Sequence, residues 1–498
     1  MKISVDFLKV LGGFSAAALA SGVNPLAAAN AARPLAGQKP NIILILTDDQ
    51  GYGDLGRNGN PVLKTPNLDR MYDEGIHFED FHVSPSCAPT RSCLMTGMHE
   101  FKNGITHTIF ERDRLSLSAR TVADVLKGAG YATGIFGKWH LGDEAEYQPH
   151  RRGFDEVFIH GGGGIGQTHR GSLGDAPGNT YFNPAILHNG TFVKTQGYCT
   201  DVFFAQAMRW MDQQRQRHRP FFAYLATNAP HSPYIAKPED KAIYADQGLA
   251  ENVQSFLGMI HNIDQNVGAL RAQLAAWGIE RETLIVYMND NGGTLGTGIH
   301  NAGMRGSKGS PHNGGTRAMS LWCWPGTIQP AACDHLTAHL DFMPTCAELA
   351  GVELPAELQK KLDGFSLVPL LCDPKAKWHE ERMLVTHIGR WGLGKEPAKY
   401  GEKGNDCSIR WKNFLQVRSG AAWQLFDLKA DPGQKKNIAE ASGELVKKLD
   451  AYYDSWWHAV VPCLVNEEAY KTAPQINPFK EQYCKQFGLP LPKMKAVK

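Results

Sequence analysis

The sequence predicts an α/β protein with a mostly parallel sheet sandwiched by helices, followed by a smaller C-terminal subdomain of antiparallel sheet plus helix. Short apolar runs alternate with segments of helical periodicity over most of the chain, which is the pattern of parallel strands joined by helices. These runs are apolar at nearly every position, as strands covered on both faces are. Past about residue 373, short apolar runs lie between glycine-rich and charged segments, which favours a small antiparallel sheet.

The individual elements are predicted from these runs. Strands of the large sheet are expected at 41–46, 132–136, 221–227, 283–288 and 319–323. The clearest helix is expected over 253–274, where apolar residues recur every three or four positions before the stop signal of Gly278. A second helix is expected over 118–127, ahead of Gly128 and Gly130. In the C-terminal part we expect strands at 383–387, 414–417 and 423–428 and a helix near 444–457.

The chain divides into a leader over residues 1–37, a main domain over 38–375, and a C-terminal subdomain with a tail over 376–498. The leader places Lys2 and Lys9 near a short apolar run and then small residues that resemble cleavage signals. It predicts export, to a bacterial periplasm or as a secreted protein. A disordered tail is the alternative, and the cleavage site stays open. Ten cysteines without a CxxC pair predict neither a disulfide framework nor a structural zinc site.

Charge and hydropathy exclude two classes of partner. The chain has 52 Lys and Arg residues against 50 Asp and Glu residues, a net charge of +2. Nucleic-acid-binding proteins usually carry a strong basic excess, so nucleic acid is not an expected partner. No stretch reaches the roughly 18 consecutive apolar residues that a membrane-spanning helix needs. We therefore expect a globular protein without a membrane span.

Polar residues stand where four of the expected strands end. They are Asp48 and Asp49, Lys138 and His140, His231, and Asp290 and Asn291. Because ligands bind outside the carboxyl ends of parallel strands, these side chains are expected to form one site. The acids and the amide offer the hard oxygen ligands of Ca²⁺ or Mg²⁺ and not those of zinc. For either pair alone, helix capping and turn formation are the alternative interpretation.

The segment 84–97 contains the motif C-x-P-x-R-x-x-x-x-T-G. Its fixed residues are Cys87, Pro89, Arg91, Thr96 and Gly97. Pro89 suits the first turn of a helix, because it lacks the N–H group that would be unpaired there. Cys87 is then expected at the helix N-terminus, where the helix dipole favours negative charge, and Arg91 adds a fixed cation. On these grounds the motif predicts an activated cysteine in an anion site.

This motif resembles the signature of the type I, formylglycine-dependent sulfatases of the alkaline phosphatase superfamily. The second signature of that family, G-Y-x-T-x-x-x-G-K-x-H, is matched at every fixed position by Gly130, Tyr131, Thr133, Gly137, Lys138 and His140. The resemblance covers most of residues 40–350 and resumes at 423–437. It implies an alkaline-phosphatase-like fold and makes 38–375 the expected sulfatase catalytic domain.

The resemblance also implies the activity and its groups. It implies a sulfuric ester hydrolase that cleaves a sulfate monoester, with a sulfated carbohydrate as the expected substrate and one Ca²⁺ expected ahead of Mg²⁺. A maturation enzyme would oxidise Cys87 to formylglycine, an aldehyde. The implied metal ligands are Asp48, Asp49, Asp290, Asn291 and the modified Cys87. The implied catalytic residues are Cys87, Arg91 and Lys138 around the aldehyde hydrate, His140 at one of its hydroxyls, and His231 and Lys308 at the substrate sulfate.

In the expected reaction, a hydroxyl of the hydrate loses its proton to Asp290 and attacks sulfur, and His231 or Lys308 protonates the leaving oxygen. Two alternatives stay open. One is a phosphomonoester or phosphonate monoester hydrolase of the same superfamily, and the other is a non-catalytic glycan-binding protein in which Cys87 is not matured. The chain departs from many relatives at Asn313, which stands where they have the glutamate of E-G-G-x-R.

Some residues outside these motifs are expected in loops near the cleft. They are Lys102, His107, His169, Arg170, Arg390 and Trp391, and a solvated or structural role is favoured for each. Gly161, Gly163 and Gly166 match G-x-G-x-x-G, but no helix follows, so we expect a loop beside the cleft and no dinucleotide site. Cys93 is expected to pack on the inner face of the helix that Cys87 opens.

Overall fold

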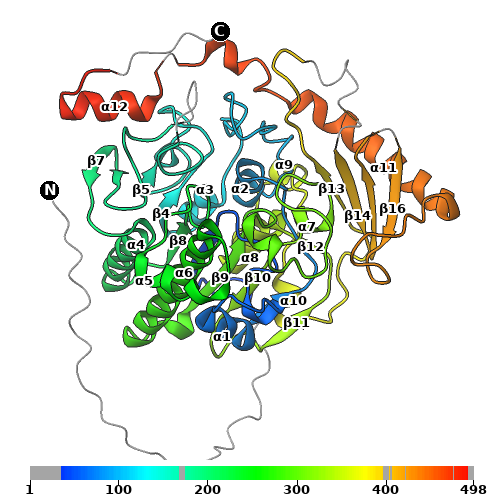
Figure 1. Cartoon of the computed structure of the whole chain (residues 1–498), viewed down its shortest axis with the longest axis horizontal. Coiled ribbons are helices and arrows are strands. Elements are labelled where there is room, and N and C mark those ends of the chain that lie inside the picture. Colours follow the sequence, from blue (N-terminus) through cyan, green and yellow to red (C-terminus); the bar gives the residue numbers. More distant parts are fainter. Residues whose placement is uncertain are drawn as a thin grey trace, which may run out of the picture.

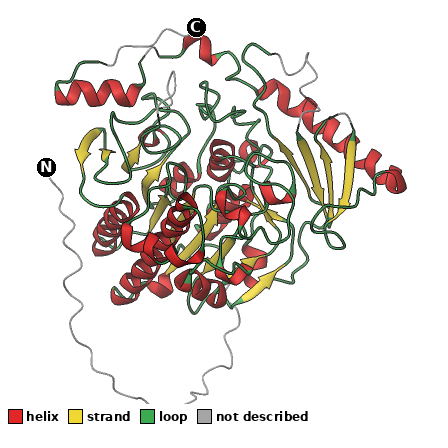
Figure 2. Ribbon diagram, in the orientation of Figure 1, coloured by secondary structure: helices red, strands yellow, loops and turns green. Residues whose placement is uncertain are grey.

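The computed structural model describes residues 35–167, 174–395, 403, 406–420, 422–474 and 476–491. Most of the predicted leader (1–34) and the cleft candidates His169 and Arg170 lie outside the described residues. The described chain forms a large sheet with helices on both faces and a separate four-stranded sheet (Figures 1 and 2). This arrangement confirms the predicted fold class.

Ten strands form the large sheet. In spatial order they are β11 (Ala331–Cys333), β2 (Ile76–Phe78), β10 (Ser320–Cys323), β9 (Thr283–Asn289), β1 (Asn41–Thr47), β8 (Phe221–Ala226), β4 (Ala132–Lys138), β5 (Glu156–His160), β6 (Ala185–His188) and β7 (Thr191–Lys194). The five neighbours β9, β1, β8, β4 and β5 run parallel. Antiparallel strands flank them, with β10 beside β9 and β6 beside β5. All five strands predicted for this sheet are present.

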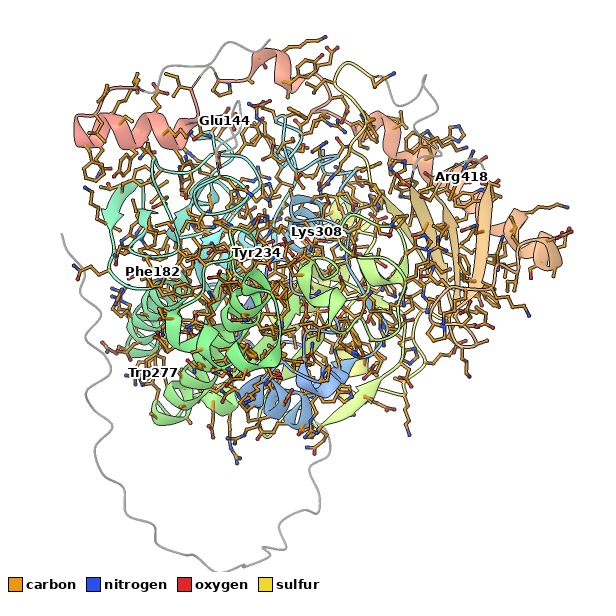
Figure 3. All side chains as sticks on the ribbon, viewed as in Figure 1. Glu144, Phe182, Tyr234, Trp277, Lys308 and Arg418 are labelled. Carbon is orange, nitrogen blue, oxygen red and sulfur yellow. The ribbon has the colours of Figure 1, made fainter. Side chains whose placement is uncertain are left out.

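Both faces of the large sheet are buried. In β1, Ile42, Leu44 and Leu46 belong to one core and Ile43 and Ile45 to the other, as the alternation of side chains along a strand requires. The first core includes residues of α2 (Cys87–Thr96), α3 (Val122–Gly128) and α8 (Phe342–Leu349). The second includes residues of α1 (Pro66–Glu74), α4 (Cys199–Gln216) and α6 (Glu251–Ala276). Side chains fill the space between these layers (Figure 3), so the loops at the strand ends are left to carry a site.

Shorter elements complete this part of the chain. They are β3 (Phe81–His82), which pairs with β12 (Thr337–Ala338), and the helices α5 (Pro238–Ala242), α7 (Asn313–Thr316), α9 (Ala356–Gln359) and α10 (Val368–Cys372).

The second sheet is antiparallel and keeps the order of the chain. Its strands are β13 (Met383–His387), β14 (Cys407–Trp411), β15 (Phe414–Arg418) and β16 (Trp423–Asp427). The helix α11 (Gly443–Val460) packs on this sheet, because its Leu449 and Tyr453 share a buried cluster with Cys407, Ile409 and Leu425. Three of these strands and the helix agree with the prediction from the sequence, whereas β14 was not predicted. The predicted domain boundary near residue 375 stays a prediction.

Two helices differ from their prediction. α3 begins at Val122 and not at 118, because the Thr121 side chain accepts a hydrogen bond from the Asp124 backbone N–H and the Asp124 carboxylate accepts one from Thr121 in return. The expected tail contains α12 (Pro478–Phe487), whose Phe479 and Tyr483 pack edge-on against Phe192 of β7. Within the described ranges, no helix has the length and apolar character needed to cross a membrane.

Candidate active site

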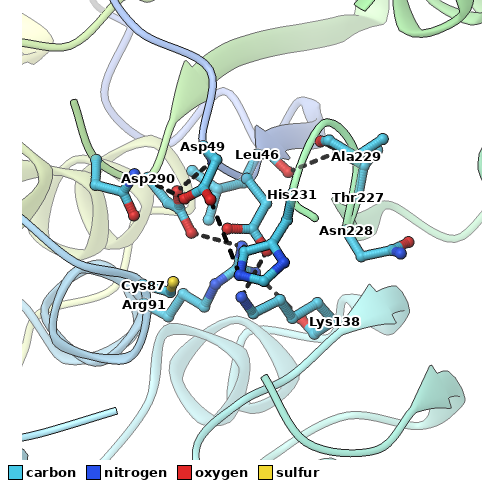
Figure 4. A network of polar contacts seen from close by, with 12 residues as sticks. Leu46, Asp49, Cys87, Arg91, Lys138, Thr227, Asn228, Ala229, His231 and Asp290 are labelled. Carbon is cyan, nitrogen blue, oxygen red and sulfur yellow. Dashed lines mark hydrogen bonds and ion pairs between the residues drawn. The ribbon is translucent and has the colours of Figure 1, made fainter. Parts of the chain in front are cut away.

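Four neighbouring parallel strands deliver the predicted site residues to one edge of the sheet. Asp48 and Asp49 follow β1, Asp290 and Asn291 follow β9, His231 lies in the loop after β8, and Lys138 is the last residue of β4. The loop after β8 is fixed by Tyr181, whose hydroxyl donates to the carbonyls of Asn228 and His231 at 2.9 and 2.6 Å. The side chains converge beside Cys87 and Arg91 of α2 (Figure 4).

Cys87 is the first residue of α2, as predicted, and is only 3% exposed. Lys308 Nζ lies 3.5 Å from its Sγ. Burial nevertheless raises the pKa of the Cys87 thiol, and the nearby charges of Lys138 and Lys308 offset this only in part. For the unmodified thiol, desolvation thus outweighs the nearby cations, and the predicted role of Cys87 stays a prediction.

Two buried ion pairs lie in the site: one joins the end of β4 to the residues after β1, and the other joins α2 to the residues after β9. Lys138 Nζ lies 2.5 Å from Asp48 Oδ2, and Arg91 Nη2 lies 2.8 Å from Asp290 Oδ2. Burial opposes ionisation of Asp48, but the charges of Lys138, His231 and Arg91 hold its pKa well below the ordinary value. Burial, with the Asp48 charge next, raises the pKa of Asp290 to about 7. Asp48 is thus charged near neutrality, whereas Asp290 is able to take up a proton.

Ligand atoms of Asp48, Asp49, Cys87 and His231 all lie within 4.8 Å of one another. Asp48 Oδ1 and Asn291 Oδ1 are buried without a hydrogen-bond partner. Two orphaned oxygens beside a cluster of carboxylates are what a hard divalent cation requires, so the residues present fit Ca²⁺ or Mg²⁺. Of the predicted ligands, Asp48, Asp49, Cys87 and Asn291 meet here.

Asp290 and His231 lie at the same edge of the sheet as the other predicted residues, and their predicted roles as metal ligand and as sulfate contact stay predictions. Asp290 Oδ1 accepts from the Asp49 backbone N–H at 3.2 Å, and its Oδ2 faces Arg91, so both oxygens have protein partners. His231 belongs to the cluster of ligand atoms, with Nε2 3.9 Å from Asp49 Oδ2. The loop after β8 brings the imidazole to the acids, which the order of residues in the chain does not reveal.

Lys308 links the predicted metal ligands to position 87. Its Nζ contacts Asp49 Oδ1 as well as Cys87 Sγ. Burial opposes the charge of this ammonium, but the neighbouring Cys87 and Asp49 hold the pKa of Lys308 above its ordinary value. A fixed positive charge therefore lies next to the first residue of α2.

His140 is held in one orientation at the rim of the site. Its backbone φ is +60°, and its Nε2 lies 2.9 Å from the carbonyl oxygen of Thr108. Burial, with the charge of Lys138 next, keeps the pKa of His140 far below its usual range, so the ring is neutral. With Nε2 donating to Thr108, Nδ1 is an acceptor, and it is buried without a partner. That nitrogen can accept a hydrogen bond from a hydroxyl.

Sequence reasoning did not find the groups that hold these side chains. Thr108 acts through a backbone carbonyl, and Tyr181 and Tyr224 are unremarkable residues of a loop and a strand; the Tyr224 hydroxyl lies 3.5 Å from Arg91. No sequence motif marks any of them. The glycine loop was expected beside the cleft, and a Cβ placed on Gly163 or Gly164 would lie 2.8 Å from His140 Cε1 or 3.2 Å from His231 Nδ1.

A second buried group lies along α2. Cys93 Sγ donates to Glu100 Oε2 at 3.0 Å, and ligand atoms of Cys93, Glu100 and His339 lie within 4.8 Å of one another. Cys93 is completely buried, as expected, but it carries a polar contact as well. Burial raises the pKa of Glu100 to about 7.

A family model described as Sulfatase matches residues 40–352 of the chain. A second model, described as N-sulphoglucosamine sulphohydrolase, C-terminal, matches residues 312–453. The chain belongs to the sulfatase family. This sulfatase is 35% identical to arylsulfatase A of Homo sapiens over 458 residues, which cover 82% of the chain and 86% of the relative. It is 28% identical to N-acetylgalactosamine-6-sulfatase of Sus scrofa, over 83% of the chain and 84% of the relative.

Solved structures agree with this membership. The sulfatase is similar to a structure titled Ps i-CgsB, with 31% identity and a TM-score of 0.74 over 84% of this chain and 92% of that chain. A complex of Ps i-CgsB with k-i-k-neocarrahexaose matches with 30% identity and a TM-score of 0.73, over the same shares. The phosphonate monoester hydrolase of Agrobacterium radiobacter shares the fold, with 17% identity and a TM-score of 0.56 over 85% of this chain and 96% of that chain. The protein is a sulfuric ester hydrolase, as predicted.

Proposed function

We propose that this sulfatase hydrolyses sulfate esters of a carbohydrate, with formylglycine at position 87 and one Ca²⁺. Two similarities support the carbohydrate substrate. Relatives named N-acetylgalactosamine-6-sulfatase match over most of the chain, and a structure 30% identical to it is titled as a complex with k-i-k-neocarrahexaose. Family membership supports the modified cysteine and the cation.

One observation carries the proposal: position 87, at the start of α2, lies among the ligand atoms of Asp48, Asp49 and His231 and next to Lys308. A sulfate ester is an anion, and cleaving it moves negative charge onto the leaving oxygen. Buried cations fixed before the substrate arrives stabilise this charge far better than water does. Arg91, Lys138 and Lys308 have that arrangement around position 87.

As a hydrated aldehyde, residue 87 supplies the hydroxyl that attacks the sulfur of the ester. Asp48, Asp49, Asp290 and Asn291 together with position 87 would hold a Ca²⁺, which would supply positive charge beside the reacting oxygens. Asp290, with a pKa of about 7, accepts the proton of the attacking hydroxyl. His140 accepts a hydrogen bond from the other hydroxyl at Nδ1, which no described residue occupies. After the alcohol has left, His140 takes the proton of this hydroxyl while the bond between the carbon of residue 87 and the sulfate oxygen breaks, which releases sulfate and regenerates the aldehyde.

His231 is placed to protonate the leaving oxygen. Its Nδ1 lies 2.7 Å from the Ser232 carbonyl oxygen and therefore carries a hydrogen. Only the imidazolium form then has a proton to give from Nε2, the nitrogen that faces Asp49. Lys308, which reaches position 87 directly, binds the sulfate oxygens and is the second candidate donor.

The test is sulfate release by protein produced together with a formylglycine-generating enzyme. Substrates are an aryl sulfate and a panel of sulfated saccharides, and the mass of the peptide around residue 87 shows whether it is converted. Cys87→Ala is expected to abolish release, whereas Cys372→Ala, at an exposed cysteine, is expected to leave it unchanged. Full activity in Cys87→Ala contradicts the proposal. Release of phosphate from phosphate or phosphonate esters in preference to sulfate points to the alternative hydrolase.

We also propose that the leader directs export. Expression of the full chain with a periplasmic extract and N-terminal sequencing of the recovered protein checks this. A mature N-terminus within or just after residues 1–37 is the expected result, and full-length protein confined to the cytoplasm contradicts it.

A further inference from the structure

The turn between β13 and β14 reaches from the second sheet to the loop that holds His140. The backbone N–H of Arg390 donates to the Thr106 carbonyl at 3.1 Å, and Arg390 Nη2 lies 3.4 Å from the Thr108 hydroxyl oxygen. The carbonyl of the same Thr108 is the partner of His140 Nε2. Arg390 is therefore connected to a proposed catalytic residue through one intervening residue.

The backbone of this turn is unusual. Gly389 and Arg390 have φ values of +65° and +54°, both in the left-handed region. A Cβ on Gly389 would lie 2.2 Å from the Thr106 carbonyl oxygen, so only glycine allows this approach. For arginine the left-handed conformation is strained, and a strained residue of this kind often marks a functional position.

A buried cluster fixes the turn in place. The Trp391 carbonyl accepts from Arg112 Nη1 at 2.8 Å, and the Arg112 guanidinium lies over the Trp391 ring at 4.7 Å. Glu467 accepts from Trp391 Nε1 at 2.5 Å and pairs with Arg112 at 3.3 Å. Two segments that are distant in the sequence, those of Arg112 and Glu467, thus hold the residue next to Arg390, which makes its position a property of the folded chain.

Arg390 itself differs from the other arginines of this region. Arg112 and Arg114 are buried and pair with Glu467 and Glu144. Arg390 is exposed, and within the described part of the chain no carboxylate forms an ion pair with it. Most of its five N–H donors are therefore available, in the planar geometry that binds a sulfate or a carboxylate through two hydrogen bonds.

We propose that Arg390 binds a second anionic group of the substrate, a sulfate or a carboxylate that is not cleaved. The proposal rests on the proposed function, because it assumes that a sulfated carbohydrate enters the site beside His140. The contact through Thr108 places this second group close to the ester that is hydrolysed, on the same sugar or the next one. Arg390 then selects carbohydrates with two neighbouring negative charges.

Turnover of matched disaccharides tests this. One disaccharide carries a single sulfate, a second carries two sulfates, and a third carries one sulfate and a uronate carboxylate, which separates the two sources of charge. Arg390→Ala is expected to raise KM for a doubly charged disaccharide by about tenfold or more, the usual effect of one charge-assisted hydrogen bond. The kcat values, and both parameters for the singly charged sugar and for an aryl sulfate, are expected to change less than twofold.

Two further variants separate recognition from structure. Arg390→Lys keeps the charge but not the planar donors, so an intermediate KM is expected. Arg217→Ala removes another exposed arginine, at the end of α4 just before β8 begins and thus at the opposite edge of the sheet, and is expected to behave as the parent. An equal loss on singly and doubly charged sugars, or no loss on either, overturns the proposal.

Binding to the Cys87→Ser variant gives an answer that does not depend on turnover. Calorimetry with the same disaccharides is expected to show tighter binding of a doubly charged sugar, and this preference is expected to disappear with Arg390→Ala and to weaken in high salt. Equal affinity with and without Arg390, or no preference in the parent, overturns the proposal. Absence of sulfate release from every substrate contradicts the proposed function instead, and the binding preference still decides on Arg390.

Discussion

Asp48 and Asp290 show how two buried carboxylates in one site acquire different protonation states. Asp48 lies 2.5 Å from the Lys138 ammonium, so cations offset the cost of its burial. Burial, with the charge of Asp48 next, raises the pKa of Asp290 to about 7, although Asp290 also faces Arg91. Like charges in a site of low polarity cannot both ionise freely. The pair therefore offers one permanent negative charge and one proton acceptor.

Removal of divalent cations is expected to lower the thermal stability of the protein. Asp48 Oδ1 and Asn291 Oδ1 have no protein partner, so a cation bound there stabilises only the folded state. At 100 times its Kd, Ca²⁺ adds about 2.7 kcal/mol. Thermal unfolding after chelation, with Ca²⁺ or Mg²⁺ added back, measures the effect. Asn291→Ala is expected to respond less, and the exposed Asn252→Ala to respond as the parent; identical responses contradict the assignment.

Glu100 is expected to make the protein less stable as the pH rises. Burial raises its pKa from 4.5 to about 7, so between these values the folded chain binds a proton that the unfolded chain has lost. The stabilisation is complete below pH 4.5 and is lost as the pH rises through 7, a change on the order of 3 kcal/mol. Urea unfolding at pH 5 and pH 8 measures it. Glu100→Gln, which is neutral at both values, is expected to have a smaller difference, and an unchanged difference contradicts the prediction.

The connecting segments, more than the strands, decide the geometry of the site. The parallel strands determine which residues lie at the carboxyl edge of the large sheet. The loops after β5 and β8 determine how His140 and His231 are oriented. Gly163 lies against His140, where a Cβ would be 2.8 Å from Cε1, and the ring is already held at Nε2 by the Thr108 carbonyl. The loop has room for a hydrogen atom and none for a methyl group.

Gly163→Ala is therefore expected to lower kcat by about 10- to 100-fold, because small displacements of a catalytic group have effects of that size. Sulfate release measures the effect, and thermal unfolding is expected to change little. Gly443→Ala, at the first residue of α11 where nothing lies within 4 Å of the added Cβ, serves as the control. A kcat of Gly163→Ala equal to that of the parent contradicts the prediction, because it shows that the loop accommodates the added methyl group without displacing His140.

The elements that sequence predicted best are those with a continuous apolar pattern. β1, β8 and β9 are buried at every position except the first residue of β1, and polar residues follow them. Both their position and the site at their carboxyl ends could therefore be predicted from the sequence. β14 was missed because Ser408 and Arg410 interrupt its apolar residues, although both are buried in the fold. The contact of Thr108 with His140 and the approach of His231 to Asp49 depend on loop conformation, which no spacing of residues encodes.

At the scale of the molecule, the C-terminal region lies on two sides of the main part of the chain (Figure 1). β13–β16 form their own sheet, whereas α12 lies against β7 at the opposite side of the molecule (Figure 1). Asn477, just before α12, donates to Asp143 at 3.2 Å, and Asp143 accepts from the backbone of Gly162. The C-terminal residues thus hold the glycine loop beside His140.

Phe479→Ala is expected to destabilise the protein by about 3–5 kcal/mol, the usual cost of emptying a buried aromatic position. Phe479 is 1% exposed and packs on Phe192, and a Cβ on Gly161 would touch its ring. Urea unfolding measures the loss, and kcat is expected to fall as well because the glycine loop loses its support. Leu489→Ala, at a side chain 47% exposed, is expected to change stability by less than about 0.5 kcal/mol. Parent-like stability of Phe479→Ala contradicts the role of α12.

The burial of Cys87 has a consequence for the biogenesis of the enzyme. At 3% exposure the residue is closed to a second protein once α2 is packed, so the proposed oxidation of Cys87 would have to precede folding of the main domain. The segment that braces the glycine loop, Asn477 with α12, is translated long after α2. During synthesis there is therefore an interval in which residue 87 is accessible to a second protein, while the segment that supports the glycine loop has not yet been translated. The fraction of active enzyme in a cell then depends on the rate of the proposed Cys87 oxidation relative to the rate at which the main domain folds.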